Sequence, residues 1–221
     1  MVLTRSQAQA FYDRFGSKQD AQGYYEDAAL DDLVGNAAFE KAASVFEFGC
    51  GTGRFAYRLL SGHLPPSAAY LGIDSSQTMI ELAAQRLSNY APRAKVARSD
   101  GAMRFPCPDR SVDRMVATYV LDILSEQDIR EALREARRVL MPEGKVCLVS
   151  LGGGVTLGSR IVGALWSAVF RLHAPLVGGC RPIRLDSFVD QRNWSVAYQN
   201  VVSRLGVASE VLIASPRRTR K

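Results

Sequence analysis

The residues best suited to chemistry lie in a short glycine-rich segment, residues 45–54 (VFEFGCGTGR). An apolar run delivers a carboxylate and then three glycines at every second position. Glycine has no Cβ and tolerates positive φ, so such a loop lets a small-molecule ligand approach the backbone closely. The dinucleotide-binding fingerprint reads G-x-G-x-x-G/A, and Arg54 stands where its last small residue belongs. The segment therefore predicts a ligand-binding loop of another pattern, E-x-G-x-G-x-G.

Two further acids follow apolar runs. Asp74 lies about twenty residues past the glycine segment, the distance at which an acid meets ribose hydroxyls in nucleotide-binding βαβ units. A carboxylate accepts from two hydroxyls at once, and Ser75 or Ser76 can cap the following helix, which leaves Asp74 for a ligand. Asp100 can accept a hydrogen bond from an amino group, although Asp-Gly alone is also a turn signal. These acids predict a polar ligand site.

The elements that must position these residues alternate between strand-like and helical stretches. Such alternation predicts a parallel sheet with helices on both faces. Ligands in these sheets bind at the carboxyl ends of the strands, and each candidate residue lies just after a predicted strand. The predicted strands are 45–48, 69–73, 94–98, 112–118 and 145–151, and the predicted helices between them are 54–61, 76–89 and 128–140.

Together these features resemble the class I S-adenosylmethionine (SAM) dependent methyltransferases, particularly the subgroup like the ubiquinone/menaquinone and small-molecule methyltransferases. The resemblance covers roughly residues 44–151, including residues 138–145 (RVLMPEGK), which are similar to the subgroup's "RVLxPGG" turn. Glu143 departs from that pattern, which favours Gly there. The resemblance implies an α/β, Rossmann-like fold: a seven-stranded, mostly parallel sheet with helices on both faces and an antiparallel last strand.

The resemblance also implies the cofactor, SAM, with S-adenosylhomocysteine as product and no metal. The glycine loop would lie close to the methionine part of SAM, and Glu47 would favour the ammonium group of that part. Asp74 would bind the ribose. Met79 would lie against the adenine, and Thr118 and Tyr119 would face the sulfonium. The expected cofactor-binding residues are Glu47, Gly49, Cys50, Gly51, Gly53, Asp74, Ser75, Met79, Asp100, Gly101, Ala102, Thr118 and Tyr119.

The rest of the chain is expected to build the acceptor side of a single domain, residues 1–221. Residues 1–42 form a helical N-terminal cap, 43–151 the SAM-binding core, 152–192 a helical substrate-covering insert, 193–215 a C-terminal hairpin and 216–221 a basic tail. An apolar helix over 155–172 is expected to make the acceptor pocket hydrophobic, with Tyr25 and Trp166 in it. The alternatives are an interfacial helix that takes a lipid or quinone from a membrane surface, and a helix packed on the sheet or a second subunit.

Three residues are candidates for a general base: Asp122, His173 and Tyr12. Each could instead have a structural role: Asp122 as a helix cap, His173 as a surface loop residue and Tyr12 as a packing residue. A thiol acceptor of low pKa would need little help from a base, because the thiolate is the reactive form. The acceptor atom stays open among nitrogen, oxygen, carbon and sulfur.

The composition of the chain limits the kinds of binding partner that we expect. Net charge is +6, but four positive charges fall in residues 217–221, and a nucleic-acid surface would need basic residues clustered on a folded face. The four cysteines show no metal-ligand spacing, and we expect no secretory signal or membrane-spanning helix. We therefore expect a cytoplasmic enzyme for a small, fairly apolar acceptor. The alternatives are methylation of a lipid at a membrane, methylation of RNA or DNA, and SAM binding without turnover.

Overall fold

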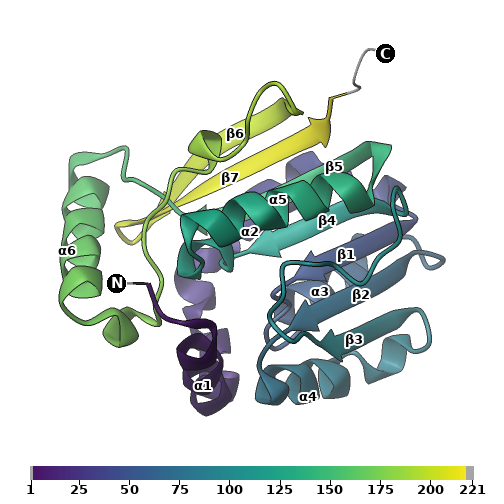
Figure 1. The fold of residues 1–221 in the computed structure, drawn as a ribbon, viewed down its shortest axis with the longest axis horizontal. Coiled ribbons are helices and arrows are strands. Elements are labelled where there is room, and N and C mark those ends of the chain that lie inside the picture. The colour runs from purple at the N-terminus through teal and green to yellow at the C-terminus, as the bar shows by residue number, and fades with distance from the viewer. Residues whose placement is uncertain (1, 218–221) are drawn as a thin grey trace.

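The computed structural model describes residues 2–217, which form a seven-stranded sheet of order β3-β2-β1-β4-β5-β7-β6 (Figure 1). Neighbouring strands from β3 to β5 run parallel, while β7 runs antiparallel to both β5 and β6. This confirms the predicted fold class. The strands are β1 Ser44–Phe48, β2 Ala69–Asp74, β3 Ala94–Arg98, β4 Val112–Thr118, β5 Leu140–Leu151, β6 Trp194–Arg204 and β7 Val207–Pro216.

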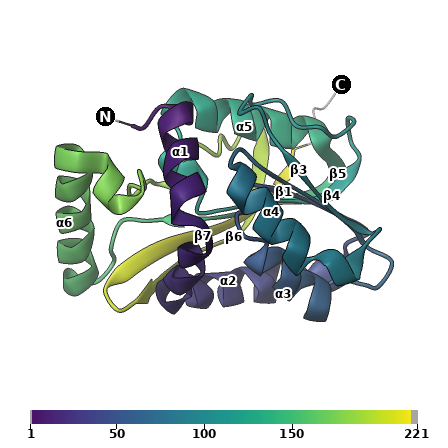
Figure 2. The same cartoon turned by 90° about the horizontal axis from the view of Figure 1, so that it is seen from below.

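Helices cover both faces of the sheet, α5 on one side and α2 and α3 on the other (Figure 2). The first helix, α1, and the 3₁₀ segment η1 follow the N-terminus and lie next to α4. The helices are α1 Arg5–Phe15, η1 Gly16–Gln22, α2 Gly23–Ala37, α3 Arg54–Gly62, α4 Gln77–Arg86, α5 Glu126–Val139 and α6 Leu157–His173, followed by the 3₁₀ turn η5 Ala174–Val177.

Two apolar clusters follow from the alternation of side chains along the central strands. On one face, Phe46, Met115 and Leu148 pack with the buried side of α5. On the other, their neighbours in sequence, such as Val45 and Val116, pack with α2 and α3. Strands that are buried on both faces carry continuous apolar runs, which is why the sequence pattern revealed them.

Strand β5 begins earlier than the sequence indicates. The turn expected at residues 142–144 lies inside the strand, because Val112 pairs with Leu140 and Arg114 pairs with Lys145, which leaves an irregularity between the two pairs. A Cβ on Gly144 would lie 3.0 Å from the carbonyl oxygens of Met141 and Val112, so this irregularity needs a glycine.

The C-terminal third carries less regular structure than expected. The last part of the expected helical insert, residues 184–192, contains only a 3₁₀ turn at Leu185–Ser187. Helix α6 buries only Ser159 and Phe170. No helix within residues 2–217 is both long and apolar enough to cross a membrane. Most of the expected basic tail, residues 218–221, lies outside the described residues.

Candidate functional site

The glycine segment forms the turn from β1 into α3, at the carboxyl end of β1. Gly49 N–H and Cys50 N–H both donate to the carbonyl oxygen of Ile73, at 2.8 and 3.0 Å, so the loop folds over the end of β2. Gly49, Gly51 and Gly53 have φ of +75°, +51° and +74°. This left-handed backbone explains why glycine stands at every second position.

Asp74 joins the end of β2 to this loop. Its Oδ2 accepts from Gly51 N–H at 3.0 Å, and its Oδ1 accepts from Ser76 N–H at 2.9 Å. Ser76 Oγ in turn accepts from Met79 N–H at 3.2 Å and caps α4. The cap is therefore Ser76, which leaves the Asp74 carboxylate facing the cleft. Burial raises the pKa of Asp74 above its usual range.

Two small adjoining cavities open at this edge of the sheet. The larger encloses about 100 Å³ over Asp74, Ser75 and Gly101, and the smaller about 40 Å³ beside Glu47 and Cys50. Thr118 and Tyr119, at the end of β4, line both cavities, as do Gly49 and Gln19. Arg5, Ala8 and Tyr12 of α1 cover the larger cavity.

Glu47 lies at the floor of the smaller cavity and is 1% exposed. Its Oε2 accepts a hydrogen bond of 2.6 Å from the Tyr70 hydroxyl. Burial raises the pKa of Glu47 to about 8, and the nearby Asp74 charge adds to the effect, while the Tyr70 hydrogen bond opposes it. A buried carboxyl of this kind favours a cationic ligand group, because a positive charge would offset its desolvation.

Met79 and Asp100, two of the expected cofactor residues, line neither cavity, whereas Gly101 lines the larger one. Met79 is 1% exposed and packed inside the protein. Asp100 is exposed, and its Oδ1 accepts from Ala102 N–H at 2.8 Å, which makes an Asx turn. Gly101, the next residue, has φ of +82° and borders the cavity with its backbone.

The structure brings together two of the candidate bases and one expected pocket residue. The Tyr12 hydroxyl lies 3.7 Å from Cys180 Sγ and donates to the carbonyl oxygen of Gly178 at 3.4 Å. Trp166 of α6 donates from Nε1 to the Cys180 carbonyl oxygen at 2.9 Å. Asp122 is buried next to this group, since its carbonyl oxygen accepts from the N–H of Arg181, the residue after Cys180, at 3.1 Å.

The pKa values of Tyr12 and Cys180 differ from that of Asp122 in their consequence for protonation near neutral pH. Burial raises the pKa of Tyr12 and of the Cys180 thiol well above their usual ranges, so both stay protonated near neutral pH. Burial raises the pKa of Asp122 to about 6. Its Oδ2 accepts from Leu151 N–H at 3.1 Å, and its Oδ1 is buried with no partner in the part of the chain that the structure describes. His173 is exposed at the end of α6.

Two aromatic side chains meet beside the smaller cavity, Tyr25 of α2 and Tyr119 at the end of β4. The ring of Tyr25 is buried and meets Tyr119 edge to face, with 6.0 Å between centroids. Tyr119 has φ of +53°, an uncommon conformation for a residue with a side chain, and its hydroxyl lies 2.8 Å from Ser209 Oγ. Strain of this kind gathers at ligand sites.

Two further residues line the cleft that the sequence pattern does not indicate, Glu26 and Gln19. Glu26 is buried, accepts from Arg54 at 2.9 Å, and has its pKa raised by burial to about 7. Gln19 lies over Gly51, where a Cβ would come within 3.1 Å of Gln19 Oε1. No motif marks Gln19 or Glu26, because their positions depend on how the N-terminal elements fold back.

The side chains present suit a SAM-like ligand. Gln19 Oε1 is buried and has no hydrogen-bond partner among the described residues, so the cleft holds an unused acceptor next to the glycine loop. Asp74 offers a carboxylate for a diol, Glu47 one for an ammonium group, and Tyr119, which lines both cavities, offers an aromatic ring to a sulfonium. Among residues 2–217, no group of three or more His, Cys, Asp or Glu could hold a metal ion.

Comparison with known proteins agrees with this geometry. Residues 45–144 match the family model described as a methyltransferase domain. An uncharacterized methyltransferase of Geobacillus kaustophilus is 32% identical over 61% of this chain and 59% of its own length. The demethylmenaquinone methyltransferase of Thermotoga maritima is 29% identical over 80% of this chain and 74% of its own. The chain spans 51% to 59% of the length of the first four curated relatives that it matches.

Solved structures share the fold at low sequence identity. A chain of the complex with the Haloferax volcanii Trm112 methyltransferase activator superposes with a TM-score of 0.76 and 13% identity, over 97% of this chain and 99% of that one. The N-methyltransferase NodS of Bradyrhizobium japonicum, solved with S-adenosylhomocysteine, gives 0.66 and 16%, over 87% and 88%. Residues 45–144 therefore match a methyltransferase domain, and the fold around them is one that solved methyltransferase structures share.

Proposed function

We propose that this protein transfers a methyl group from SAM to a small, fairly apolar acceptor. The observation that carries the proposal is the contact between Asp74 and Gly51, which unites the acid of β2 and the glycine loop of β1 at one edge of the sheet. The buried, unpartnered Gln19 oxygen next to it supports the same ligand. Bound SAM would supply an electrophilic methyl group on sulfur and leave S-adenosylhomocysteine after transfer.

Two groups of residues would hold the cofactor. Asp74 would accept from the ribose hydroxyls, and the backbone around Gly101 would border the adenine. Glu47, at the floor of the smaller cavity, would meet the ammonium group, with Gly49 and Gly51 next to it. Thr118 and Tyr119 line both cavities and would therefore face the sulfonium between these two ends.

The N-terminal cover would have to move for the cofactor to enter. The two cavities enclose about 100 and 40 Å³, whereas pockets for small molecules typically have about 300–1,000 Å³. Every residue of helix α1 is exposed or half-buried, and η1 is held by polar contacts, chiefly from Asp20 to Thr52 and Arg86. Opening of residues 5–22 would join the two cavities.

Asp122 is the best supported of the candidate bases. Its pKa of about 6 lies near the range where a general base works best, and its buried Oδ1 has no hydrogen-bond partner within residues 2–217. Tyr12 would instead position the acceptor as a neutral hydroxyl, because burial keeps it protonated. Orientation of the acceptor alone can contribute about 7–11 kcal/mol to such reactions, so a nucleophilic acceptor would not need the base.

The test has two stages. Isothermal titration should show binding of S-adenosylhomocysteine by the full chain. Tritium from labelled SAM should then pass to an organic-soluble product when the chain is incubated with a cell extract. Absence of binding sinks the cofactor assignment, whereas binding without label transfer favours a SAM-binding protein without turnover.

A second candidate, methylation of a lipid or quinone at a membrane surface, is favoured by α6. Leu157, Ile161, Leu165 and Leu172 share one face of this helix by their spacing, and all four side chains are more than half exposed. Arg160 and Arg171 are exposed on the same helix, which contains no acid. Apolar residues flanked by arginines fit the surface of an anionic bilayer.

Vesicle binding tests this candidate separately. The full chain should sediment with vesicles that contain anionic lipid, and Leu165→Asp/Leu172→Asp should release it. Tyr57→Asp is the matched control, because Tyr57 is 46% exposed on α3, on the side of the molecule away from α6 (Figure 1). If the parent protein stays in solution, or if Tyr57→Asp has the same effect, the acceptor does not come from a membrane through α6.

A further inference from the structure

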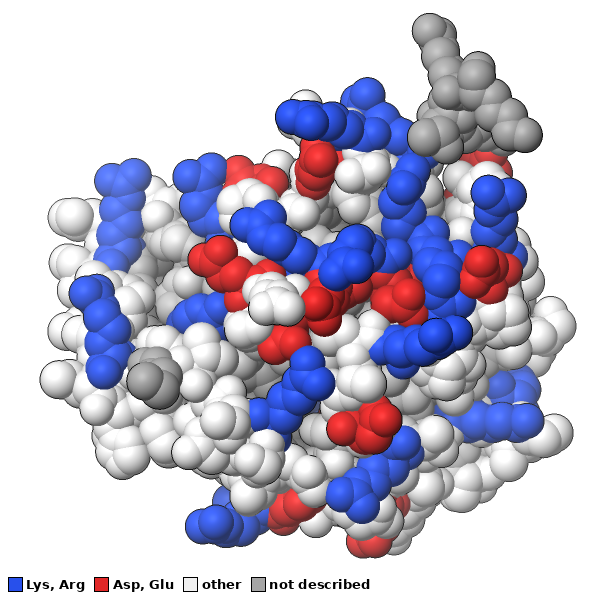
Figure 3. Space-filling view, in the orientation of Figure 1, with Lys and Arg blue, Asp and Glu red and all other residues white. Residues whose placement is uncertain are grey.

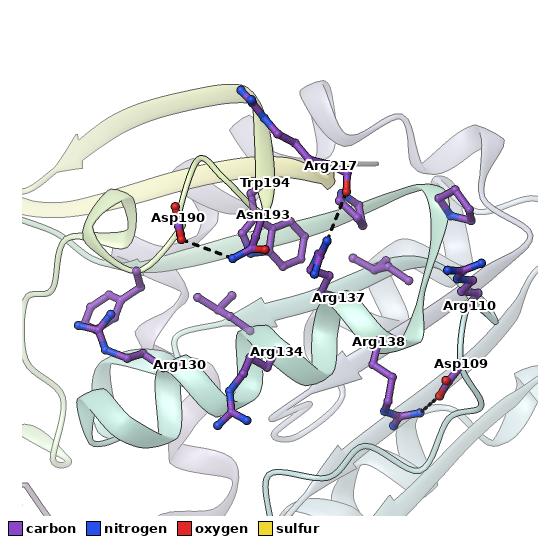
Figure 4. Close-up of a pocket in the computed structure, with 15 residues that line it drawn as sticks. Asp109, Arg110, Arg130, Arg134, Arg137, Arg138, Asp190, Asn193, Trp194 and Arg217 are labelled. Atoms are coloured by element: carbon purple, nitrogen blue, oxygen red, sulfur yellow. Dashed lines mark hydrogen bonds and ion pairs between the residues drawn. The ribbon is translucent and has the colours of Figure 1, made fainter. Parts of the chain in front are cut away.

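A groove of about 1,150 Å³ lies on the opposite edge of the sheet from the glycine loop (Figure 4). Its walls are α5, the loop before β4, the segment that leads into β6, and the start of β5. These segments meet at the amino ends of the parallel strands, whereas the cofactor cleft lies at the carboxyl ends. The groove is therefore a separate feature from the cofactor cleft.

Arginine dominates this groove. Four of its arginines lie on one face of α5, at positions i, i+4, i+7 and i+8, so they follow successive turns of the helix. The space-filling view shows Lys and Arg side chains gathered over this part of the molecule, with acidic side chains beside them (Figure 3). The six arginines that line the groove are Arg110, Arg130, Arg134, Arg137, Arg138 and Arg217.

Three of these six arginines have no acidic partner within residues 2–217, and the other three differ in how well they are paired. Arg138 is fully engaged by Glu135 and Asp109, both at 2.7 Å. Arg130 and Arg134 reach acids of their own helix only at 3.7 and 3.6 Å, in exposed pairs that contribute little.

The other three arginines, Arg110, Arg137 and Arg217, form no ion pair within the described part of the chain. Arg137 reaches only the Arg217 carbonyl oxygen, at 3.4 Å, and its Nε is buried without a partner. An unpaired donor of this kind needs an acceptor, and none is supplied by residues 2–217.

We propose that the groove binds the phosphate backbone of a single-stranded nucleic acid. Arginines at successive helical turns stand about 5.4 Å apart, and those from Arg130 to Arg138 cover about 12 Å, so they suit a row of anions rather than one phosphate. Guanidinium groups bind phosphate in bidentate geometry, and positively charged grooves track single-stranded backbones. Trp194 is 3% exposed, so its ring does not offer a base-stacking face, and binding should be sequence-tolerant.

The shape of the groove argues against a membrane as its partner. A peripheral helix inserts apolar side chains into the bilayer, but Ile129, Leu133 and Val139 of α5 are buried in the core. The arginines line a hollow rather than a projecting face. The proposal is independent of methyl transfer, because no residue of the cofactor cleft takes part in it.

Fluorescence anisotropy with a labelled oligouridine of about 20 nucleotides and its DNA counterpart tests the proposal on the full chain. Binding should weaken with salt, with a slope of about −0.7 per neutralised phosphate in a plot of log K against log salt. Arg134→Glu/Arg137→Glu should weaken binding at least about tenfold and make the slope shallower by about 1.4. Arg134→Gln/Arg137→Gln should have a smaller effect in the same direction.

Arg160→Glu/Arg171→Glu on α6 is the matched control, since it makes the same change in net charge on exposed helical arginines. It should bind the oligonucleotides within about twofold of the parent protein. Retained affinity for S-adenosylhomocysteine would show that the variants fold. The proposal fails if the control weakens binding equally, if the parent shows no salt-dependent binding, or if poly-glutamate of equal charge displaces the oligonucleotide. That last outcome would assign the groove to an acidic protein.

Discussion

Asp74 Oδ2 accepts a hydrogen bond of 3.0 Å from Gly51 N–H, so the acid of β2 and the glycine loop of β1 form one unit. The two residues are 23 positions apart, but the parallel pairing of β1 with β2 brings the ends of both strands to the same edge of the sheet. A ligand that binds the loop therefore meets the carboxylate as well.

Removing the charge of Asp74 should weaken cofactor binding without unfolding the protein. In Asp74→Asn, one oxygen can still accept from Gly51 or Ser76, but the charged acceptor for two hydroxyls is lost. Hydrogen bonds to charged groups contribute about 1.5–3 kcal/mol, so the affinity for S-adenosylhomocysteine should fall at least about tenfold. Isothermal titration measures this, with the exposed Asp186→Asn as control. Equal affinity in the two variants would remove Asp74 from the site.

Stability should depend on pH through Glu47. Its pKa is about 8 in the folded protein, against about 4.5 when unfolded, so the folded state binds the extra proton between these values. The free energy of unfolding therefore falls as pH rises from about 5 to 8. Glu47→Gln removes this dependence, and the gap in melting temperature between variant and parent should widen over that range. A constant gap would mean that Glu47 is not held protonated.

Gly51→Ala and Gly35→Ala should change stability in opposite directions. At Gly51 the backbone has φ of +51°, and a Cβ would lie 3.1 Å from Gln19 Oε1, so alanine should destabilise the fold by about 1–2 kcal/mol. Gly35 lies in α2 with nothing within 4 Å of its Cβ position, so alanine there should stabilise by about 0.5–1 kcal/mol. Urea denaturation measures both. Equal effects would show that the left-handed turn is not required.

The N-terminal cover should loosen when Asp20 is replaced. Asp20 accepts from Thr52 at 2.6 Å and from Arg86 at 2.5 Å, and these contacts tie η1 to the glycine loop and α4. In Asp20→Ala, amide hydrogen exchange over residues 5–22 should be faster, and S-adenosylhomocysteine should slow it again. Asp31→Ala, which breaks the ion pair of Asp31 with Arg58, is the control and should leave residues 5–22 unchanged. Unchanged exchange in Asp20→Ala would mean that other contacts hold the cover.

The cofactor cleft could be anticipated from sequence because its signals are local. The spacing from Glu47 to Gly53, and Asp74 at the end of the next strand, follow from the βαβ unit itself. The role of Ser76 as helix cap was also within reach, since serine before a helix satisfies free N–H groups. Met79 shows the limit, because helical spacing alone does not say whether a side chain faces a ligand or the interior.

The acceptor side and the arginine groove could not be anticipated in this way. Cys180 meets Tyr12 across 168 residues, and Arg217 reaches Arg137 across 80. In the sequence, positive charge is most concentrated in the last residues, whereas the arginines of α5 are spread among acids and apolar residues. Only the helical turn sorts them onto one face.

The sequence by itself therefore determined the order of strands and helices, the glycine turn and the carboxylates around it, because these depend on periodicity and on contacts between successive elements. The tertiary structure decided which N-terminal side chains cover the cleft, which candidate base is buried, and that six arginines share one groove. Those outcomes depend on packing between segments far apart in the chain, and no local pattern encodes that packing.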